Sequence, residues 1–245
     1  MSKAKPEDII EYYSRKDVVE HYYENRFHGL GGSYIQNNEI SSNLSILKDI
    51  KKPNNSVKVL DVGAGSGRLS KVLKKAGYNT HSLDSSLEMA KRLKNIISPK
   101  NIIVQSAFSK INRSEKFDVI TSLRFFDHFH IKDQKKLLVN FTKSLKNDGV
   151  IVFSALNKNS LEYLFSKFFY FGKVNFYYTD EGYKKLFKSL ELKVLERDQR
   201  FFLPRGAFLY LQKLPLLMRL AIHLDTYLTD KLPSFSASFV YILRK

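Results

Sequence analysis

Short apolar runs alternate with amphipathic segments along the first two thirds of the chain. Runs rich in Val, Ile and Leu predict buried strands at about residues 57–62, 80–83, 102–105, 117–122 and 149–154. Segments of helical period are expected at about 41–51, 66–76, 86–97 and 132–146. Strands alternating with helices of this length predict an α/β fold, in which helices cover both faces of a parallel sheet.

The C-terminal third has a different pattern. An aromatic-rich stretch covers 161–171, a helix is expected over 180–190 after an N-cap at Thr179 or Asp180, and strands are expected at 192–196 and 238–243. Residues 206–229 are apolar but are interrupted by polar residues and a proline, so they predict no membrane span. They could cap a pocket, contact a membrane surface or hold a lipid-like substrate.

The composition narrows the possible classes of protein. A chain of 245 residues can bury one substantial core, and we expect a single domain. The absence of cysteine excludes disulfides, a thiolate metal site and a cysteine nucleophile. The polar N-terminus lacks the apolar run of a signal peptide, which favours a cytoplasmic location.

The chain is strongly basic, with a formal net charge of +17. Such a charge is compatible with binding to nucleic acid or to an anionic membrane. The lysines and arginines are scattered over predicted helix surfaces and form no dense block, so a solvated surface explains them more simply. Nucleic acid is therefore the less favoured partner.

The segment from Val59 to Ser70 leads from a predicted strand through three glycines into a predicted helix. Glycines in such a turn let the backbone approach a ligand closely. Gly63, Gly65 and Gly67 give the spacing GxGxG, which differs from the GxGxxG of dinucleotide sites, and no P-loop lysine follows. The turn indicates a nucleotide-type cofactor site, although a purely structural turn would have the same glycines.

A second predicted strand ends in Asp84, at a distance along the chain that suits a carboxylate binding ribose hydroxyls. The alternative is that Asp84 only caps the helix starting near Ser85 or Ser86.

Further segments complete a recognisable order: Ile102 to Phe108, then Phe117-Asp118 opening a fourth strand, then Asp148-Gly149 before a fifth. Together with the glycine turn and Asp84, this order resembles the class I S-adenosylmethionine-dependent methyltransferases. The resemblance implies a Rossmann-like, doubly wound, seven-stranded sheet with the last strand antiparallel. It also implies S-adenosyl-L-methionine as the cofactor.

The resemblance further implies where the cofactor lies. The amino-acid portion would lie near the glycine turn, the ribose near Asp84 and Met89, and the adenine near Ala107 and Phe108. Arg68 either orients the carboxylate of the methionine portion or faces solvent. The residues expected at the cofactor are Tyr22, Arg26, Asp61, Gly63, Ala64, Gly65, Gly67, Asp84, Ser85, Met89, Ala107, Phe108 and Leu123.

The N-terminal segment contains Tyr22 and Arg26 at helical i, i+4 spacing. Similar arrangements in small-molecule methyltransferases form a lid that pairs with the cofactor carboxylate. The nearby Gly29, Gly31 and Gly32 could then form a hinge. The alternative is a surface helix that packs its tyrosines on the sheet.

Asp127 and His128 follow the fourth predicted strand and resemble the Glu-His pair of many relatives. Histidine titrates near neutrality, so His128 suits the role of a base that removes a proton from an acceptor, with Asp127 as its partner. The alternative is that His128 only hydrogen-bonds the loop or the cofactor. The quinone-ring enzymes carry a metal-binding glutamate where this chain has Arg124, so no metal is expected.

We therefore expect one methyltransferase domain over residues 1–245, with a helical lid at 1–40, a cofactor-binding core at 41–154 and substrate-capping segments at 155–245. The expected reaction is methylation of a small-molecule acceptor, most plausibly at oxygen, with quinone-like, lipid-like and glycan-like acceptors all open. Peripheral contact with a membrane is compatible with this function. The alternatives are an RNA-modifying methyltransferase and a non-catalytic cofactor-binding scaffold protein.

Overall fold

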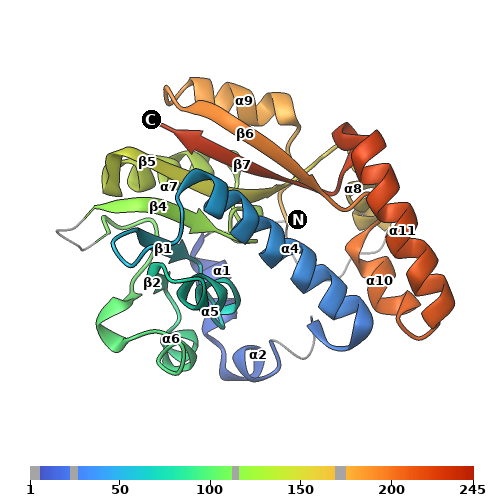
Figure 1. Ribbon diagram of the computed structural model, residues 1–245, viewed down its shortest axis with the longest axis horizontal. Helices are drawn as coiled ribbons and strands as arrows, with labels where there is room; N and C mark the ends of the chain where they lie inside the picture. The colour runs from blue at the N-terminus through green and yellow to red at the C-terminus, as the bar shows by residue number, and fades with distance from the viewer. Residues whose placement is uncertain (1–5, 23–26, 112–115, 169–174) are drawn as a thin grey trace.

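The computed structural model describes residues 6–22, 27–111, 116–168 and 175–245. A single seven-stranded sheet crosses the molecule in the order β3-β2-β1-β4-β5-β7-β6 (Figure 1). Its strands are β1 (Lys58–Val62), β2 (Asn79–Asp84), β3 (Ile102–Val104), β4 (Phe117–Ser122), β5 (Leu145–Leu156), β6 (Lys193–Arg200) and β7 (Ser238–Arg244). Neighbours from β3 to β5 are parallel, whereas β7 is antiparallel to both β5 and β6. The predicted doubly wound sheet with an antiparallel last strand is confirmed.

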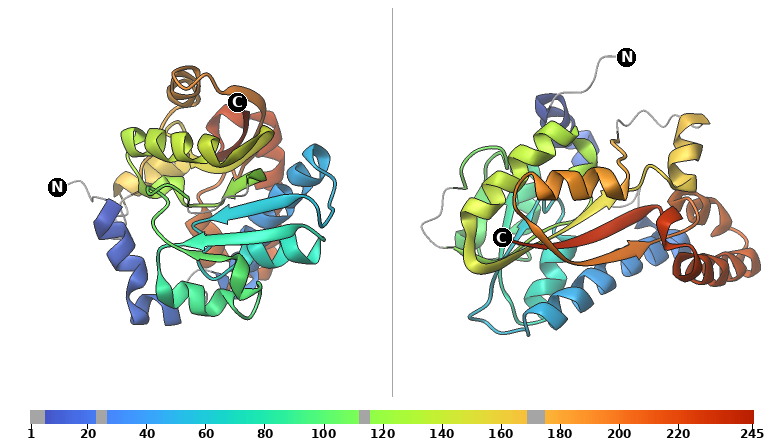
Figure 2. Two further views of the ribbon diagram at one scale, coloured as in Figure 1. Left: turned by 90° about the vertical axis from the view of Figure 1, so that its left-hand side faces the viewer. Right: turned by 90° about the horizontal axis from the view of Figure 1, so that it is seen from above.

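Helices cover both faces of this sheet (Figure 2). The α-helices are α1 (Pro6–Ser14), α2 (Lys16–Glu20), α4 (Gly29–Ile50), α5 (Arg68–Lys75), α6 (Leu87–Leu93), α7 (Ile131–Ser144), α8 (Leu161–Phe168), α9 (Asp180–Lys188), α10 (Arg205–Leu211) and α11 (Pro215–Lys231). Short 3₁₀ turns are η1 (Pro99–Asn101), η2 (Phe126–His128) and η3 (Pro233–Phe235).

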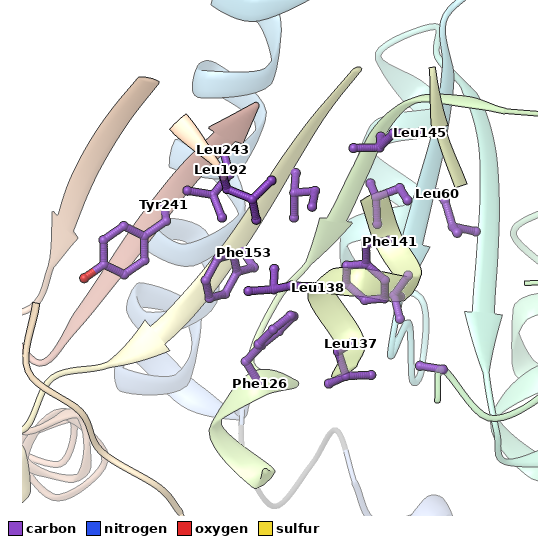
Figure 3. Packing of buried hydrophobic residues seen from close by; sticks show 14 of the residues in the cluster. Leu60, Phe126, Leu137, Leu138, Phe141, Leu145, Phe153, Leu192, Tyr241 and Leu243 are labelled. Carbon is purple, nitrogen blue, oxygen red and sulfur yellow. The ribbon is translucent and has the colours of Figure 1, made fainter. Parts of the chain in front are cut away.

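The central strands β1, β4 and β5 bury both of their faces over their apolar runs, as those runs predict. Leu60, Ile120 and Ile151 belong to a core with α7 and α9, in which Phe153 lies beside Phe126 and Leu138 (Figure 3). The residues one position earlier on each strand, from Val59 onward, belong to a second core with α4 and α5. Successive strand residues point to opposite faces, so an all-apolar strand requires a helical layer on each side.

One helix differs from the prediction. The segment expected as a helix at 41–51 is the C-terminal part of α4, which begins at Gly29, so the predicted boundary between residues 40 and 41 falls inside a continuous helix. Gly31 and Gly32 are buried in the first turns of that helix. A Cβ on Gly31 would overlap the backbone of Phe208 in α10, and one on Gly32 would overlap the backbone of Phe27, so these glycines permit close packing where the sequence suggested a hinge.

Two strands are longer than expected: β5 begins at Leu145, and β6 continues to Arg200. Residues 145–148 continue β5 through a register shift, because Leu145 pairs with Phe117 while Val150 pairs with Val119. A bulge of this kind bends the strand without ending it.

A buried cluster of charges holds several elements together. Glu39 of α4 lies 3.1 Å from Arg124, 3.4 Å from Arg68 and 3.5 Å from Arg205. Arg205 also forms an ion pair with Glu162 of α8. Burial alone would raise the pKa of Glu39, but the three guanidinium groups hold it below its ordinary value. One carboxylate thus connects α4, the start of α5, the loop after β4 and α10.

We predict that Glu39→Gln lowers the free energy of unfolding by about 3–5 kcal/mol, because it leaves buried guanidinium groups without their counter-charge. The pKa of Glu39 is depressed in the folded protein, so its contribution is present above the ordinary value of 4.5 and is lost as the pH falls below it. Urea unfolding at several pH values measures both effects.

The matched control is Glu88→Gln, which removes a surface pair with Lys91 and should cost less than about 1 kcal/mol. Equal effects of the two substitutions, or a Glu39 effect that grows as the pH falls below 4.5, would contradict the role of the cluster.

Candidate functional site

A pocket of about 690 Å³, partly open to solvent, lies where β1, β2 and β4 end. Ligands of open α/β sheets bind at this edge, where the strand order reverses. Many of the predicted residues meet there. Those that line the pocket are Tyr22, Gly63, Gly65, Asp84, Ser85, Met89, Ala107, Phe108, Leu123 and His128.

The glycine turn is held by the end of the neighbouring strand. The amides of Gly63 and Ala64 donate to the carbonyl of Leu83 at 2.9 and 3.1 Å. Gly63, Gly65 and Gly67 all have positive φ, at 68°, 53° and 80°, a conformation that favours glycine. The turn therefore has a defined shape set by backbone bonds to β2.

The three glycines serve different purposes. A Cβ on Gly67 would lie 2.8 Å from the side chains of Leu93 and Ile96, and one on Gly63 would overlap the ring of Phe125. A Cβ on Gly65 would meet only the carbonyl oxygen of Gly63, at 4.0 Å. Since Gly65 lines the pocket, its missing side chain leaves space for a ligand, whereas Gly63 and Gly67 leave space for the protein's own packing.

Asp84 connects the turn to the helix that follows β2. One carboxylate oxygen accepts from the amide of Gly65 at 2.7 Å, and the other accepts from the amide of Ser86 at 2.9 Å. Burial raises the pKa of Asp84, and the amides of Ser86 and Gly65 oppose that rise. Ser86 is the N-cap of α6 and accepts from the amide of Met89. Asp84 therefore supports the start of this helix and also lines the pocket.

Asp61 lies outside the pocket lining. It is buried and accepts a hydrogen bond of 2.6 Å from the hydroxyl of Ser70, which also contacts the hydroxyl of Ser82. Burial raises its pKa to about 7. Among the residues expected at the cofactor, Ala64 and Gly67 are likewise absent from the described lining. Asp61 thus connects β1 to α5 beneath the turn.

Hydrogen bonds from a side chain of α7 hold the turn that follows β3. The side-chain amide of Asn140 donates to the carbonyls of Ala107, Phe108 and Ser109, at 3.1, 2.8 and 3.0 Å. The ring of Phe108 packs edge-on against Phe129, with 5.1 Å between centroids. Aromatic surface therefore lies beside Ala107. Asn140 supports this turn, and the family motifs in the sequence did not indicate it.

The N-terminal segment contributes to the pocket through α1. Ile9, Ile10 and Tyr13 line it together with Tyr22, and the hydroxyl of Tyr13 lies 3.3 Å from Nε2 of His128. Arg26, predicted to share a face with Tyr22, lies outside the described residues. Tyr13 was not among the residues expected at the cofactor, and no local motif distinguishes it.

The side chains of His128 and Asp127 have different surroundings. His128 ends η2 and lines the pocket. The carboxylate of Asp127 accepts from the amide of Leu156 at 3.1 Å, and its carbonyl oxygen accepts from the amide of Phe176. Burial raises the pKa of Asp127 to about 6, against the opposing charges of Arg124 and Arg205. The structure thus makes Asp127 a support of the loop that carries His128, where a catalytic role was predicted.

A second, smaller cavity of about 250 Å³ adjoins the pocket. Asp127, Glu39 and Arg205 line it, and Arg124 lines both cavities. Arg124 has φ of 54° although it is not glycine, and its amide donates to the hydroxyl of Ser154 at 2.7 Å. Strained backbone of this kind often marks a functional site. From the sequence, Arg124 was expected only to stand where the quinone-ring enzymes carry a metal-binding glutamate.

The C-terminal third does not contribute to the described pocket lining, which ends at Phe129. The substrate-capping role expected of residues 155–245 is therefore not seen in this pocket. Phe165 and Phe168 of α8 are exposed, and α10 packs on α4 through Phe208.

Comparison with known sequences gives one family for most of the chain. Residues 34–197 match the family model described as a methyltransferase domain. A ubiquinone biosynthesis O-methyltransferase from Actinobacillus pleuropneumoniae is 30% identical over 116 residues, which cover 44% of this chain and 49% of the relative. A protein of the same name from Hydrogenovibrio crunogenus is 27% identical over 175 residues, covering 68% and 71%. The first match thus spans only about half of that relative's length.

Solved structures share the fold. Magnesium protoporphyrin IX methyltransferase (ChlM) from Synechocystis PCC 6803, with bound SAH, has a TM-score of 0.68 at 14% identity and covers 98% of this chain and 100% of its own. An S-adenosylmethionine-dependent methyltransferase from Clostridium acetobutylicum has a TM-score of 0.61 at 16% identity, covering 93% and 98%.

We predict that Gly65→Ala weakens binding of S-adenosylhomocysteine at least tenfold, since the new methyl group would occupy space in the pocket. Gly77→Ala is the matched control, because Gly77 also has positive φ, at 100°, and no atom lies near its missing Cβ. Both substitutions should cost about 1–2 kcal/mol of folding free energy from backbone strain. Calorimetric titration of the two variants separates the effects, and normal affinity in Gly65→Ala would mean that the turn does not touch the ligand.

Proposed function

The chain belongs to the S-adenosylmethionine-dependent methyltransferases, and from this premise we propose that it transfers the methyl group of S-adenosyl-L-methionine to an oxygen of a small-molecule acceptor. The observation that carries the proposal is the convergence of the glycine turn, Asp84 and His128 on one pocket. The first two suit a nucleoside, and the third suits removal of a proton.

The carboxylate of Asp84 fits a ribose. An ionised carboxylate has about four acceptor positions, and the amides of Gly65 and Ser86 occupy two of them. The remaining positions can accept from two neighbouring hydroxyl groups. Ala107 and Phe108 would then lie beside the adenine, with Met89 near the sugar, as the family resemblance implies.

Two buried polar atoms near the glycine turn fit the amino-acid portion of the cofactor. The hydroxyl of Ser66 and Nη1 of Arg68 have no hydrogen-bond partner among the described residues. Buried donors of this kind are costly unless they are paired. The carboxylate of the methionine portion would supply an acceptor for Arg68, whose guanidinium group is held in place by Glu39 and by the ring of Phe27.

When bound, the cofactor supplies a methyl group activated by the positive charge of its sulfonium. A ring nitrogen of His128 would take the proton of an acceptor hydroxyl, which makes the oxygen a better nucleophile. Tyr13, whose hydroxyl lies 3.3 Å from Nε2, would orient the ring.

The lining of the pocket favours an acceptor with an apolar ring. Ile9, Ile10, Phe108, Phe125 and Phe129 provide apolar or aromatic surface, and rings stack favourably on such surface. One relative bears a name that refers to ubiquinone, and one protein of the same fold bears a name that refers to a porphyrin; both of these molecules contain rings. A quinone-like acceptor is therefore favoured over a glycan.

The direct test uses methyl-labelled S-adenosylmethionine with an extract separated into lipid, quinone, glycan and RNA pools. Label in the quinone or lipid pool, carried by the product as a methyl ether, supports the proposal. Label in RNA that falls steeply with salt would replace it with an RNA-modifying function. Cofactor binding without label in any pool would indicate a non-catalytic scaffold protein.

We predict that His128→Ala lowers kcat about 100-fold with little change in cofactor affinity, because only the proton transfer is lost. His130→Asn is the matched control, since His130 lies two residues further on and packs against Phe176 and Tyr178. Steady-state kinetics with the acceptor found above measure the effect. Wild-type turnover in His128→Ala would reduce His128 to a structural residue of the loop.

A further inference from the structure

Helix α11 presents a row of large apolar side chains to solvent. Leu216, Leu220 and Tyr227 recur at a spacing that places them on one side of the helix, and they are 72%, 57% and 60% exposed. Leu217 and Leu224 extend the row and are also exposed. We call these five residues the α11 face. Isolated exposed leucines are common, but a contiguous row of them is not.

The opposite side of the helix fixes this orientation. Asp225 is buried and accepts from the amides of Phe202 and Leu203 at 2.8 and 2.7 Å, and from the hydroxyl of Tyr34 at 2.9 Å. Met218 and Ala221 pack in a cluster with residues of α4 and α10. Rotating the helix to bury the leucines would break all three hydrogen bonds of Asp225, so the α11 face is held outward.

Charge indicates what covers the α11 face. Between residues 213 and 231 the exposed charges are the cations Lys213, Arg219 and Lys231 and the acid Asp230. The whole chain carries +17, so two copies meeting face to face would repel each other. An anionic surface would instead attract the protein, and leucines flanked by cations are typical of helices that lie in a membrane interface.

The length of α11 agrees with a helix that lies on a membrane and not with one that crosses it. A helix of 17 residues is about 25 Å long and would lie flat on a bilayer. Within the described residues no helix is long and apolar enough to span a membrane. The segment that contains α10 and α11 joins the end of β6 to the start of β7, and this is the sheet edge where the glycine turn lies (Figure 1).

We propose that the α11 face docks the protein on an anionic phospholipid bilayer, with its leucines among the acyl chains and Lys213, Arg219 and Lys231 at the headgroups. Docking of this kind needs no methyl transfer, so it is independent of the proposed function. It would bring the sheet edge that carries the pocket close to acceptors dissolved in the membrane.

The test is co-sedimentation of the full chain with vesicles of phosphatidylcholine, with and without phosphatidylglycerol. We expect binding to the anionic vesicles, weakened by added salt, and at least tenfold weaker binding by the variant Leu216→Gln/Leu220→Gln/Leu224→Gln. The charge variant Lys213→Glu/Arg219→Glu should lose the preference for phosphatidylglycerol. The control Leu87→Gln/Val104→Gln/Leu195→Gln removes exposed apolar residues elsewhere and should bind as wild type. Thermal unfolding checks that each variant is folded.

Three outcomes would overturn the proposal. The wild-type protein could fail to sediment with anionic vesicles, or the leucine variant and the control could bind equally well. Light scattering could also show a dimer that the leucine variant dissociates, in which case the α11 face is an interface between two copies of the chain.

Discussion

The carboxylate of Asp84 is the group on which the candidate site depends. It closes the end of β2, accepts from the turn after β1 through Gly65 and supports the start of α6 through Ser86. The amides of Gly63 and Ala64, which donate to the carbonyl of Leu83, also fix the turn to the end of β2. These contacts hold the turn through its backbone amides, and the space beside Gly65 stays open.

The second constraint is the burial of charge behind the pocket. Glu39 gathers Arg68, Arg124 and Arg205, which belong to the helix after the glycine turn, the loop after β4 and α10. Asp127 faces the same region, and its bond to the amide of Leu156 fixes the loop from which His128 reaches the pocket. One polar interior thus holds the groups that would act on cofactor and acceptor, while its charges are largely compensated within the protein.

The sequence predicted the sheet well because its central strands are buried on both faces and read as short apolar runs. The meeting of Gly65, Asp84 and Ala107 at one pocket was predictable too, since the ends of the strands determine where these residues lie. Long-range packing was not predictable in this way: nothing local indicates that Gly31 packs on Phe208, that Asn140 holds the turn at Ala107, or that Asp127 turns away from His128. The outward leucines of α11 were visible as an apolar stretch, but only the buried Asp225 shows which side of the helix faces solvent.

A crystal structure of the protein with S-adenosylhomocysteine tests the central claim most directly. We predict the ribose hydroxyls at about 2.6–3.0 Å from the carboxylate of Asp84, with the amino-acid portion passing over Gly65. A ligand bound elsewhere, or a pocket filled by side chains of α1 with no ligand between the glycine turn and Asp84, would contradict it.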